Sequence, residues 1–406
     1  DRAQHLFNRL VDAHPGAPLL VTPLTFAVLV YLTRGRLRVT RGSGIPQTIA
    51  VLRLPDRRLR REVLSVPAAA GKLVFTTAAL LGGASVGREG PTVHLGAALM
   101  FHLGRPFGFA SRRAAGHLIL AGAAAGLAAA FNTPLAGLVF AIEELAGTFE
   151  QRMSGVLMTA VILAGALALG LVGDYAYFGH VRASLPPGHP WLAVPLVGAT
   201  CGLAGGAFAR ALLLTPGFGL GRLAAVRARY PVRFAAACGA VLAGVSVLSG
   251  QHLYGSGYDQ AKALLDGTLP GALDFGLLKA LATAVSYWSG IPGGLFAPAL
   301  SIGAGLGGAL AAVVPAADGP TVAVLGMAAF LAGLTQAPLT AAVIAFELTA
   351  NHGLVVATLA TCLVARAAAA PLCPVPLYRA FAQQVMDAFE TRRKAQTHPQ
   401  APPGPG

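Results

Sequence analysis

Long apolar segments, many of them cut by Gly or Pro, recur from one end of the chain to the other. Backbone N–H and C=O groups must be satisfied internally in lipid, which favours helices, and a helical span needs about 20 residues. With 55% hydrophobic and only 11% charged residues among 406, the chain is predicted to be an all-α polytopic membrane protein with short and broken helices. The apolar segments are residues 16–33, 64–86, 114–142, 156–172, 191–214, 234–248, 275–288, 321–346 and 354–372.

The basic residues lie between these segments rather than in one patch. The net charge is +14, with arginine-rich runs at residues 57–61 and 392–394. The positive-inside rule assigns such runs to the cytoplasm, so a cytoplasmic C-terminus is expected and a nucleic-acid surface is not. The four cysteines (Cys201, Cys238, Cys362 and Cys373) have no metal-ligand spacing. We predict no disulfide, no metal site and no cofactor.

The second half of the chain repeats features of the first half in the same order. Residues 87–96 align with 294–303 at an offset of 298 − 91 = 207, and residues 132–143 align with 336–347 at 338 − 134 = 204. The Gly-Ser-Gly at 42–44 aligns with the one at 255–257 at 255 − 42 = 213. Interrupted helices in matching places are typical of inverted-repeat transporters, whose site lies between the halves.

We therefore expect a first membrane repeat over residues 1–185, a second over 186–380 and a short cytoplasmic tail over 381–406. The sequence leaves open whether the repeats are inverted or parallel, since inversion requires an odd number of spans in each half. Residues 1–3 resemble the end of the first helix of the second repeat, around residues 209–211. We expect that an N-terminal helix of the first repeat is absent from this chain.

The Gly- and Pro-containing motifs predict helix starts at membrane depth. Residues 87–91 (Gly-Arg-Glu-Gly-Pro) carry Glu89 between apolar stretches, and an ionisable group at such a place is a functional-site hypothesis. The unpaired N–H groups and the positive dipole end of a helix N-terminus bind anions. Several helix N-termini that converge would bind an anion through partial charges. A buried Lys or Arg carries a full charge and would release chloride too slowly for transport.

Three segments together resemble the signature segments of the CLC family of chloride channels and proton-coupled chloride antiporters. They are residues 42–46 (Gly-Ser-Gly-Ile-Pro), 87–91 (Gly-Arg-Glu-Gly-Pro) and 294–298 (Gly-Leu-Phe-Ala-Pro), and the likeness extends from about Ala17 to Arg379. The resemblance implies two inverted repeats of broken and tilted helices in a lipid bilayer. It also implies chloride and protons as substrates and a homodimer with one pore per subunit. The lack of a regulatory domain after Tyr378 is typical of prokaryotic members, which implies a bacterial inner membrane.

The resemblance assigns the anion site to four residues. Ser43 and Tyr378 would offer hydroxyl groups, and Leu295 and Phe296 would offer backbone N–H groups. The alternatives are an N-cap serine for Ser43, an interfacial anchor for Tyr378, and a lipid-facing or core side chain for Phe296. The family uses Pro at the position of Ser43 for nitrate preference, so Ser43 favours chloride. Some fluoride-transporting members also depart from serine, which argues against fluoride.

Glu89 matches the gating glutamate of the family. Its carboxylate can occupy an anion position, and protonation removes the charge and lets the side chain swing out for chloride. The alternative is a structural glutamate paired with Arg88 or Lys72. Those two cations would otherwise raise the local potential and attract chloride, or pair with carboxylates, or snorkel. His94, five residues after Glu89, is interpreted as a core histidine rather than a proton shuttle.

Glu144 matches the position that antiporters of the family use to receive protons from the cytoplasm. The two proton stations are 144 − 89 = 55 residues apart, in agreement with the family, whereas channel members usually carry an apolar residue there. The alternative is a surface glutamate at a helix end. Glu143 is predicted to support structure or a water path near Glu144, and its repeat counterpart Glu347 to be structural. Gln47 departs from the glutamate that is common in the family at its position.

The sequence therefore predicts a secondary active transporter that exchanges chloride for protons. The alternative within the family is a passive, voltage- or pH-gated chloride channel in which Glu144 has no role. An intramembrane hydrolase would need a nucleophile or a metal site, and the apolar segments show neither. A cation or amine transporter would place acidic residues, not converging helix N-termini with hydroxyl groups, at the interface of the repeats. The chain is not expected to be an enzyme.

Overall fold

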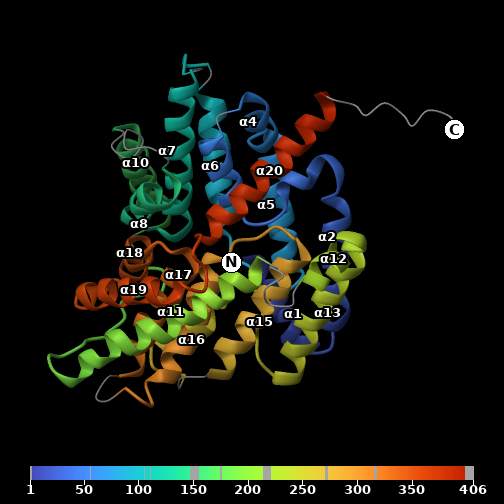
Figure 1. The fold of residues 1–406 in the computed structure, drawn as a ribbon. Helices are drawn as coiled ribbons and strands as arrows, with labels where there is room; N and C mark the ends of the chain where they lie inside the picture. Colours follow the sequence, from blue (N-terminus) through green and yellow to red (C-terminus); the bar gives the residue numbers. More distant parts are fainter. Residues whose placement is uncertain are drawn as a thin grey trace.

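The computed structural model describes residues 2–54, 56–104, 106–109, 111–146, 155–173, 176–213, 221–269, 273–314 and 318–397. Throughout this part of the chain the regular structure is helical, apart from two isolated β-bridges (Figure 1). The predicted all-α fold is confirmed. The helices of the first repeat are α1 (Arg2–Ala13), α2 (Pro18–Leu32), the 3-10 helix η1 (Gly35–Thr40), α3 (Ile45–Arg53), α4 (Arg57–Val63), α5 (Val66–Leu81), α6 (Glu89–Leu103), α7 (Arg112–Phe131), α8 (Pro134–Phe140), the π-helical turn η2 (Ala141–Leu145) and α10 (Gly155–Val172).

The motif helices of the second repeat follow one another in the same order as those of the first. Helix α16 begins at Phe296 and α6 begins at Glu89, the position 296 − 89 = 207 residues earlier. The helices are η3 (His189–Leu192), α11 (Ala193–Leu212), α12 (Gly221–Arg229), α13 (Pro231–Ser249), α14 (Tyr258–Leu265), α15 (Leu273–Ser289), α16 (Phe296–Leu310), α17 (Gly319–Thr335), α18 (Pro338–Thr349), α19 (Val355–Ala369) and α20 (Leu377–Thr397).

Helix length varies widely, as the Gly and Pro positions predict. Among the described residues, four helical stretches are long and apolar enough to cross a membrane by length and composition: Arg57–Leu81, Arg113–Phe131, His189–Leu212 and Pro231–Ser249. In contrast, α6 and α16 have 15 residues each, which corresponds to about 22 Å at 1.5 Å per residue. That is shorter than the hydrocarbon layer of about 30 Å. Helices of this length can begin inside the layer, where the motif residues lie.

Two apolar segments that read as continuous stretches are each divided into two helices. The stretch 114–142 breaks at Asn132 (φ 58°) and continues as α8 at Pro134, and 321–346 breaks at Gln336 (φ 62°) and continues as α18 at Pro338. A residue with a left-handed backbone conformation commonly ends a helix. Proline suits the start of the next helix, because the N–H group that it lacks would have no acceptor in the first turn. The two breaks occupy matching places in the repeats.

Matching helices of the two repeats run in opposite directions. Glu143 follows the C-terminal end of α8, and its carboxylate accepts from the N–H groups of Leu339 (3.2 Å) and Thr340 (2.7 Å) at the N-terminal end of α18. Glu347, near the C-terminal end of α18, accepts in the same way from the first turn of α8. Each end of α8 thus meets the opposite end of α18, and Figure 1 shows the two helices next to each other. The repeats are inverted, which the sequence alone left open.

Glycine and alanine runs allow close contact between helices, as predicted. A Cβ on Gly326 of α17 would lie 2.6 Å from the carbonyl oxygen of Gly303 on α16, and a Cβ on Gly126 of α7 would overlap the backbone of Thr92 on α6. Small residues at these positions let helix backbones approach closely, which is typical of helix packing in membranes.

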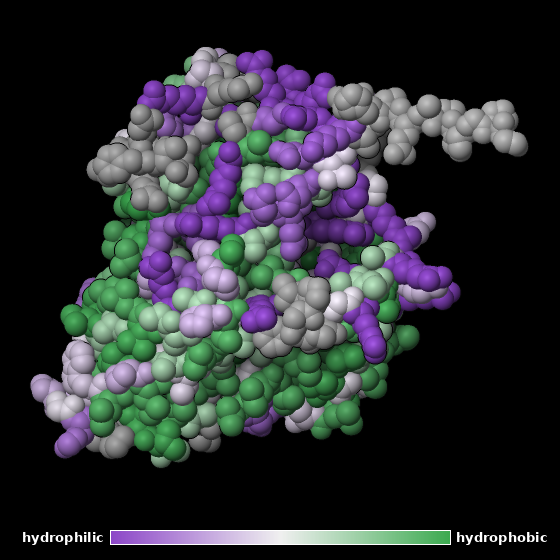
Figure 2. Space-filling view, viewed as in Figure 1, coloured by the Kyte–Doolittle hydropathy of each residue, from purple (hydrophilic) through white to green (hydrophobic). Residues whose placement is uncertain are grey.

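The C-terminal helix departs from the predicted organisation. A domain boundary was expected at residue 380, but α20 runs without a break from Leu377 to Thr397. Phe381 and Phe389 are buried, and α20 packs against α3. The stretch 381–397 therefore packs against the rest of the chain through one face of α20, and residues 398–406 lie outside the described part. Figure 2 shows hydrophilic side chains gathered on the upper part of the molecule above a mostly hydrophobic lower part.

Candidate anion site at the repeat interface

The three motif segments meet in the structure. The N–H of Gly87 donates to the carbonyl of Gly294 (2.8 Å) and the N–H of Gly294 donates to that of Gly87 (2.7 Å). The N–H of Gly293 donates to the carbonyl of Gly42 (3.3 Å). Gly44 has φ 109°, and a Cβ there would lie 2.6 Å from the carbonyl oxygen of Gly90, so only glycine fits this approach. The starts of α3, α6 and α16 are thereby held at one place.

Two buried side chains hold the loop before Ser43. Lys72 is buried, and its ammonium group donates to the carbonyls of Arg41 (3.1 Å) and Gly42 (3.2 Å). Gln47 donates to the same carbonyl of Arg41 (2.7 Å), and its amide oxygen accepts from the N–H of Gly44 (3.0 Å). These bonds engage the negative ends of the backbone dipoles of the loop, which would otherwise oppose an anion. The ammonium group of Lys72 thus binds backbone carbonyl oxygens, a role that the sequence did not indicate.

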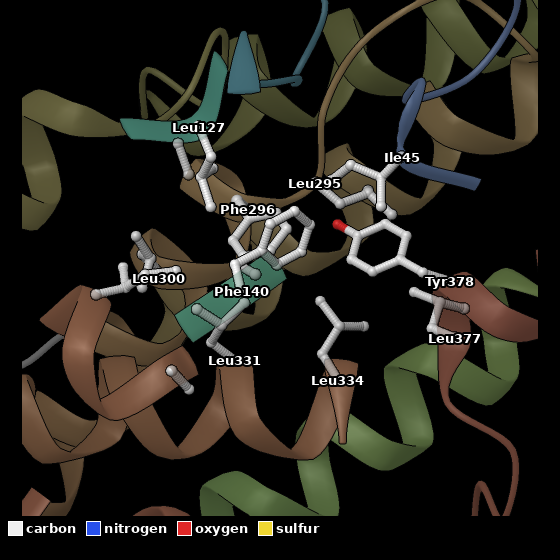
Figure 3. Packing of buried hydrophobic residues seen from close by; sticks show 14 of the residues in the cluster. Ile45, Leu127, Phe140, Leu295, Phe296, Leu300, Leu331, Leu334, Leu377 and Tyr378 are labelled. Atoms are coloured by element: carbon white, nitrogen blue, oxygen red, sulfur yellow. The ribbon is translucent and has the colours of Figure 1, made fainter. Parts of the chain in front are cut away.

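Ser43 and Tyr378 present buried hydroxyl groups. Both residues are 0% exposed, and neither hydroxyl has a hydrogen-bond partner. A Cβ on Gly90 would overlap the hydroxyl oxygen of Ser43, so this group lies against the start of α6. The hydroxyl of Tyr378 points from α20 towards the region of Leu295 and Ile45, where α16 and α3 begin (Figure 3). Buried polar groups are nearly always hydrogen-bonded, which makes these two oxygens candidate ligands for an ion.

The first residues of α16 form the other wall. Leu295 is its N-cap residue and Phe296 its first residue, and both are buried. N–H groups in the first turn of a helix have no intrahelical acceptor. The ring of Phe296 stacks on that of Tyr378 (centroids 5.7 Å apart, 10° between planes) and meets Phe140 edge-on (5.6 Å). The Phe296 side chain is thus part of the core and does not face lipid.

Glu89 is the first residue of α6 and is 1% exposed. Backbone N–H groups of Arg88, Glu89 and Ala297 interact with its carboxyl group. Its Oε2 atom has no hydrogen-bond partner and would lie 3.1 Å from a Cβ on Gly294. The carboxyl group therefore lies between the N-terminal ends of α6 and α16, where both helix dipoles favour negative charge.

Arg88 lies beside Glu89 in sequence but directs its guanidinium group elsewhere. It donates to the carbonyl of Ala130 (3.0 Å) and lies 5.9 Å from the centre of the Tyr177 ring. His94 is buried, and its Nε2 atom is 2.9 Å from the carbonyl oxygen of Val63. Its second ring nitrogen has no partner.

Glu144 lies in the π-helical turn η2 and is 2% exposed. The alternative of a surface glutamate is therefore wrong. Its Oε1 atom has no hydrogen-bond partner, and its charged neighbours are Arg379, Glu143 and Arg53. Arg379, which follows Tyr378, donates to the backbone carbonyl of Glu143 (3.3 Å). Single π-helical turns are frequent at functional sites, and this one lies directly beside the start of α20.

Glu143 has a different neighbourhood from Glu144. Besides its two backbone bonds at the start of α18, it accepts from the hydroxyl of Thr340 (2.7 Å). Both of its carboxylate oxygens are thus engaged by α18. Glu347 has the same role at the start of α8, with bonds to Leu135 (3.0 Å) and Ala136 (2.6 Å). The offset 347 − 143 = 204 was visible in the sequence, whereas the exchanged partners required the fold.

In the second repeat, the counterpart of the Ser43 loop is filled by the protein itself. The N–H and the hydroxyl of Ser256 lie 3.2 and 3.3 Å from the amide oxygen of Gln4, to which they donate. Lys279 donates to the carbonyls of Leu253 (2.7 Å) and Gly255 (2.9 Å), as Lys72 does in the first repeat, and 279 − 72 = 207. The sequence reasoning missed Lys279, Gln47 and Gln4. The repeat offset could have found only the first.

The fold defines an inverted-repeat membrane protein in which several helix N-termini converge at the candidate anion site. Residues 25–370 match the voltage gated chloride channel family, and the chain belongs to that family.

Two of the similar curated proteins are the following. The chain is 32% identical to the H(+)/Cl(-) exchange transporter ClcA of Klebsiella pneumoniae subsp. pneumoniae, over 94% of this chain and 83% of the relative. It is 32% identical to the protein of the same name from Yersinia pestis bv. Antiqua, over 92% and 80%.

Two solved structures have a similar fold. One is a slow cyanobacterial Cl−/H+ antiporter, with a TM-score of 0.78 and 25% identity over 95% of this chain and 91% of the other. The other is a CLC-type fluoride/proton antiporter, with a TM-score of 0.75 and 25% identity over 93% and 92%. The predicted resemblance to the family is confirmed.

Proposed function

We propose that this chain exchanges chloride for protons across a membrane. The observation that carries the proposal is the Glu89 carboxyl group, buried between the N-terminal ends of α6 and α16. A titratable group at a place suited to anions competes with a transported anion and carries a proton when it leaves. The relatives named as H(+)/Cl(-) exchange transporters support this reaction.

Chloride would bind at the convergence of the three helix starts. The hydroxyls of Ser43 and Tyr378 would donate to the ion, together with the backbone N–H groups of Leu295 and Phe296. These donors are neutral, so the ion is held by partial charges and can leave. One structural relative is titled a fluoride/proton antiporter; the serine at position 43 favours chloride for this chain.

Exchange would follow from the two charge states of Glu89. As a carboxylate, the side chain is held by the N–H groups at the helix ends and blocks the anion position. When protonated, it loses this attraction and yields the position to chloride. Glu144 would pass protons between Glu89 and the cytoplasm, and Arg379 and Arg53 are the cationic groups nearest to it.

We further propose a homodimer in a bacterial inner membrane with a cytoplasmic C-terminus. Helices α8, α10, α18 and α19 pack beside one another and expose large apolar side chains, among them the repeat-related Leu135 and Leu339 and also Leu167 and Val356. An exposed apolar patch of this kind suits contact with a second copy of the chain. Each subunit of the dimer would have its own pore. The arginines near α4 and at the end of α20 favour the cytoplasmic side.

The alternative is a passive chloride channel of the same family. The position of Glu144 argues against it, because a buried carboxyl group whose Oε1 atom has no hydrogen-bond partner is costly to keep unless it has a task. Its nearness to the start of α20, which carries Tyr378, gives it a place on a proton route to the anion site.

Reconstituted liposomes separate these functions. Purified protein is placed in vesicles with a chloride gradient, and chloride and proton movements are recorded together. We expect protons to move uphill in the wild type, and Glu144→Gln to pass chloride without protons. Glu390→Gln, at an exposed site on α20, is the matched control and should behave as the wild type. Chloride flux without proton movement in the wild type would establish the channel, and no chloride flux would refute both.

A further inference from the structure

A cavity of about 360 Å³ opens next to the loop that carries Ser43, at Arg41. It lies between the end of α11, helix α12, the start of α13 and the end of α15. The residues that line it are Arg41, Leu213, Ala224, Arg227, Ala228, Pro231 and Ser289. Two of the seven carry a permanent positive charge and none carries a negative one.

Neutral groups orient the first arginine of this cavity. Arg41 donates through Nε to the hydroxyl of Thr33 (3.1 Å) and through a terminal nitrogen to the carbonyl of Val30 (3.0 Å). These acceptors fix the guanidinium group but leave its charge in place. The charged groups that act on Arg41 are Arg227, Arg34 and Arg38, and all three have the same sign as Arg41.

The second arginine also lacks a carboxylate partner. Arg227 is half-buried on α12, near Tyr287 and Cys238, and a terminal nitrogen lies 3.3 Å from where a Cβ on Gly290 would be. Within the described ranges, no salt bridge joins Arg41 or Arg227 to an acidic residue. Partly buried charges of one sign repel each other unless a counter-charge is bound.

We propose that this cavity binds a phosphate group, either free phosphate or the headgroup of an anionic phospholipid. Planar guanidinium groups bind oxyanions through paired hydrogen bonds, whereas a single chloride ion would fill little of the space. The hydroxyl of Ser289 donates to the carbonyl of Ser286 (2.6 Å), so the arginines supply the donors. Helix α12 exposes Leu223 and Val226 among its arginines, as helices at a lipid interface do.

The position of the cavity gives the ligand a means to regulate transport. Arg41 directly precedes Gly42, whose carbonyl accepts from the N–H of Gly293 in the loop before α16. At the start of the loop before α16, the N–H of Ile291 donates to the hydroxyl oxygen of Ser289 (3.3 Å). A phosphate bound to Arg41 would hold both loops that shape the anion site and slow their rearrangement. This regulatory consequence rests on the proposed chloride–proton exchange, but the binding itself does not.

The test measures binding without any ion gradient, so its outcome is independent of transport. Protein in nanodiscs of phosphatidylcholine is titrated with inorganic phosphate, and thermal unfolding is followed; a second set of nanodiscs contains phosphatidic acid. We expect stabilisation in at least one set. Arg227→Gln should weaken it on the order of tenfold or more, and Arg227→Lys, which keeps the charge but loses the fork, should weaken it less. Arg222→Gln, on the same helix but outside the cavity, is the control.

The outcomes separate the source of the ligand from the existence of the site. Stabilisation by inorganic phosphate identifies the free ion, and stabilisation only by phosphatidic acid identifies a lipid headgroup. The proposal is overturned if neither stabilises the protein, if Arg227→Gln weakens stabilisation by chloride as much as stabilisation by phosphate, or if Arg227→Gln and Arg222→Gln respond alike. If Arg227→Gln does not fold, the comparison of Arg227→Lys with Arg222→Gln decides. Chloride flux with and without phosphate, in the same variants, then tests the regulatory effect separately.

Discussion

Glu143→Gln tests the reciprocal caps that join the two repeats. The Glu143 carboxylate accepts three hydrogen bonds at the start of α18, one on Oε1 from Leu339 and two on Oε2 from Thr340. A glutamine has one acceptor oxygen. If that oxygen faces Thr340, the amide NH2 faces the N–H of Leu339, donor against donor. The substitution therefore removes one bond and the negative charge at a helix N-terminus.

The expected cost follows from these two losses. A hydrogen bond to a charged group contributes about 1.5–3 kcal/mol, and a charge at a helix N-terminus contributes about 0.3–2 kcal/mol. We expect Glu143→Gln to lower the free energy of unfolding by about 2–5 kcal/mol. Glu347→Gln, which removes the matching cap of α8, should cost a similar amount, and the exposed Glu390→Gln should cost less than about 0.5 kcal/mol.

Reversible unfolding in mixed micelles of detergent and dodecyl sulfate measures these differences. A second readout separates the two caps, because only Glu143 adjoins Glu144. Glu143→Gln should lower the ratio of protons to chloride moved in liposomes, whereas Glu347→Gln should lower stability and leave the ratio unchanged. The reasoning is refuted if both cap variants unfold with the wild-type free energy. An equal change of the ratio in both would refute the positioning of Glu144 by its neighbour.

Three further substitutions probe the anion site. Tyr378→Phe removes a hydroxyl without a protein partner, so the midpoint temperature of thermal unfolding should not fall. The affinity for bromide, measured by calorimetry, should fall several-fold, equivalent to about 1 kcal/mol, and an unchanged affinity would exclude the hydroxyl as a ligand. Gly90→Ala adds a methyl group that overlaps the hydroxyl oxygen of Ser43. The overpacking should cost about 1–3 kcal/mol of stability and abolish chloride flux, whereas wild-type flux would show that the loops can separate. Ser43→Pro removes both the hydroxyl and the N–H and should shift anion preference in flux assays towards nitrate, and retained chloride preference would contradict the role of Ser43.

Much of the helical framework is encoded locally and could be predicted. The segments 114–142 and 321–346 are predicted as continuous, but their breaks at Asn132 and Gln336 have a local signal. A polar residue is followed by Pro two positions later, and Pro starts a helix readily but cannot continue one. The motif helices begin at Glu89 and Phe296 for a similar reason. Helix α20 crosses residue 380, so the change from apolar to polar composition expected as a boundary there does not coincide with a helix end. Amphipathic helices continue across such changes while one face remains packed.

The candidate site was predicted in its members but not in its supports. Ser43, Glu89 and Phe296 are brought together by the fold, as the repeat and the resemblance to the family implied. Lys72 and Gln47 hold the loop through backbone carbonyls, and such acceptors have no signature in a sequence because every residue has one. Which carbonyl a buried donor reaches depends on tertiary packing.

The clearest division lies between Ser43 and Ser256. By itself, the sequence determined two Gly-Ser-Gly loops, an apolar framework of broken helices and a titratable glutamate at one helix start. It could not distinguish the two serines, since their local surroundings match. The tertiary structure decided that α1 brings the Gln4 amide oxygen to Ser256, while the Ser43 hydroxyl stays without a protein partner. It also decided that the repeats are inverted, because direction is a property of how helix ends meet across about 200 residues and not of any local pattern.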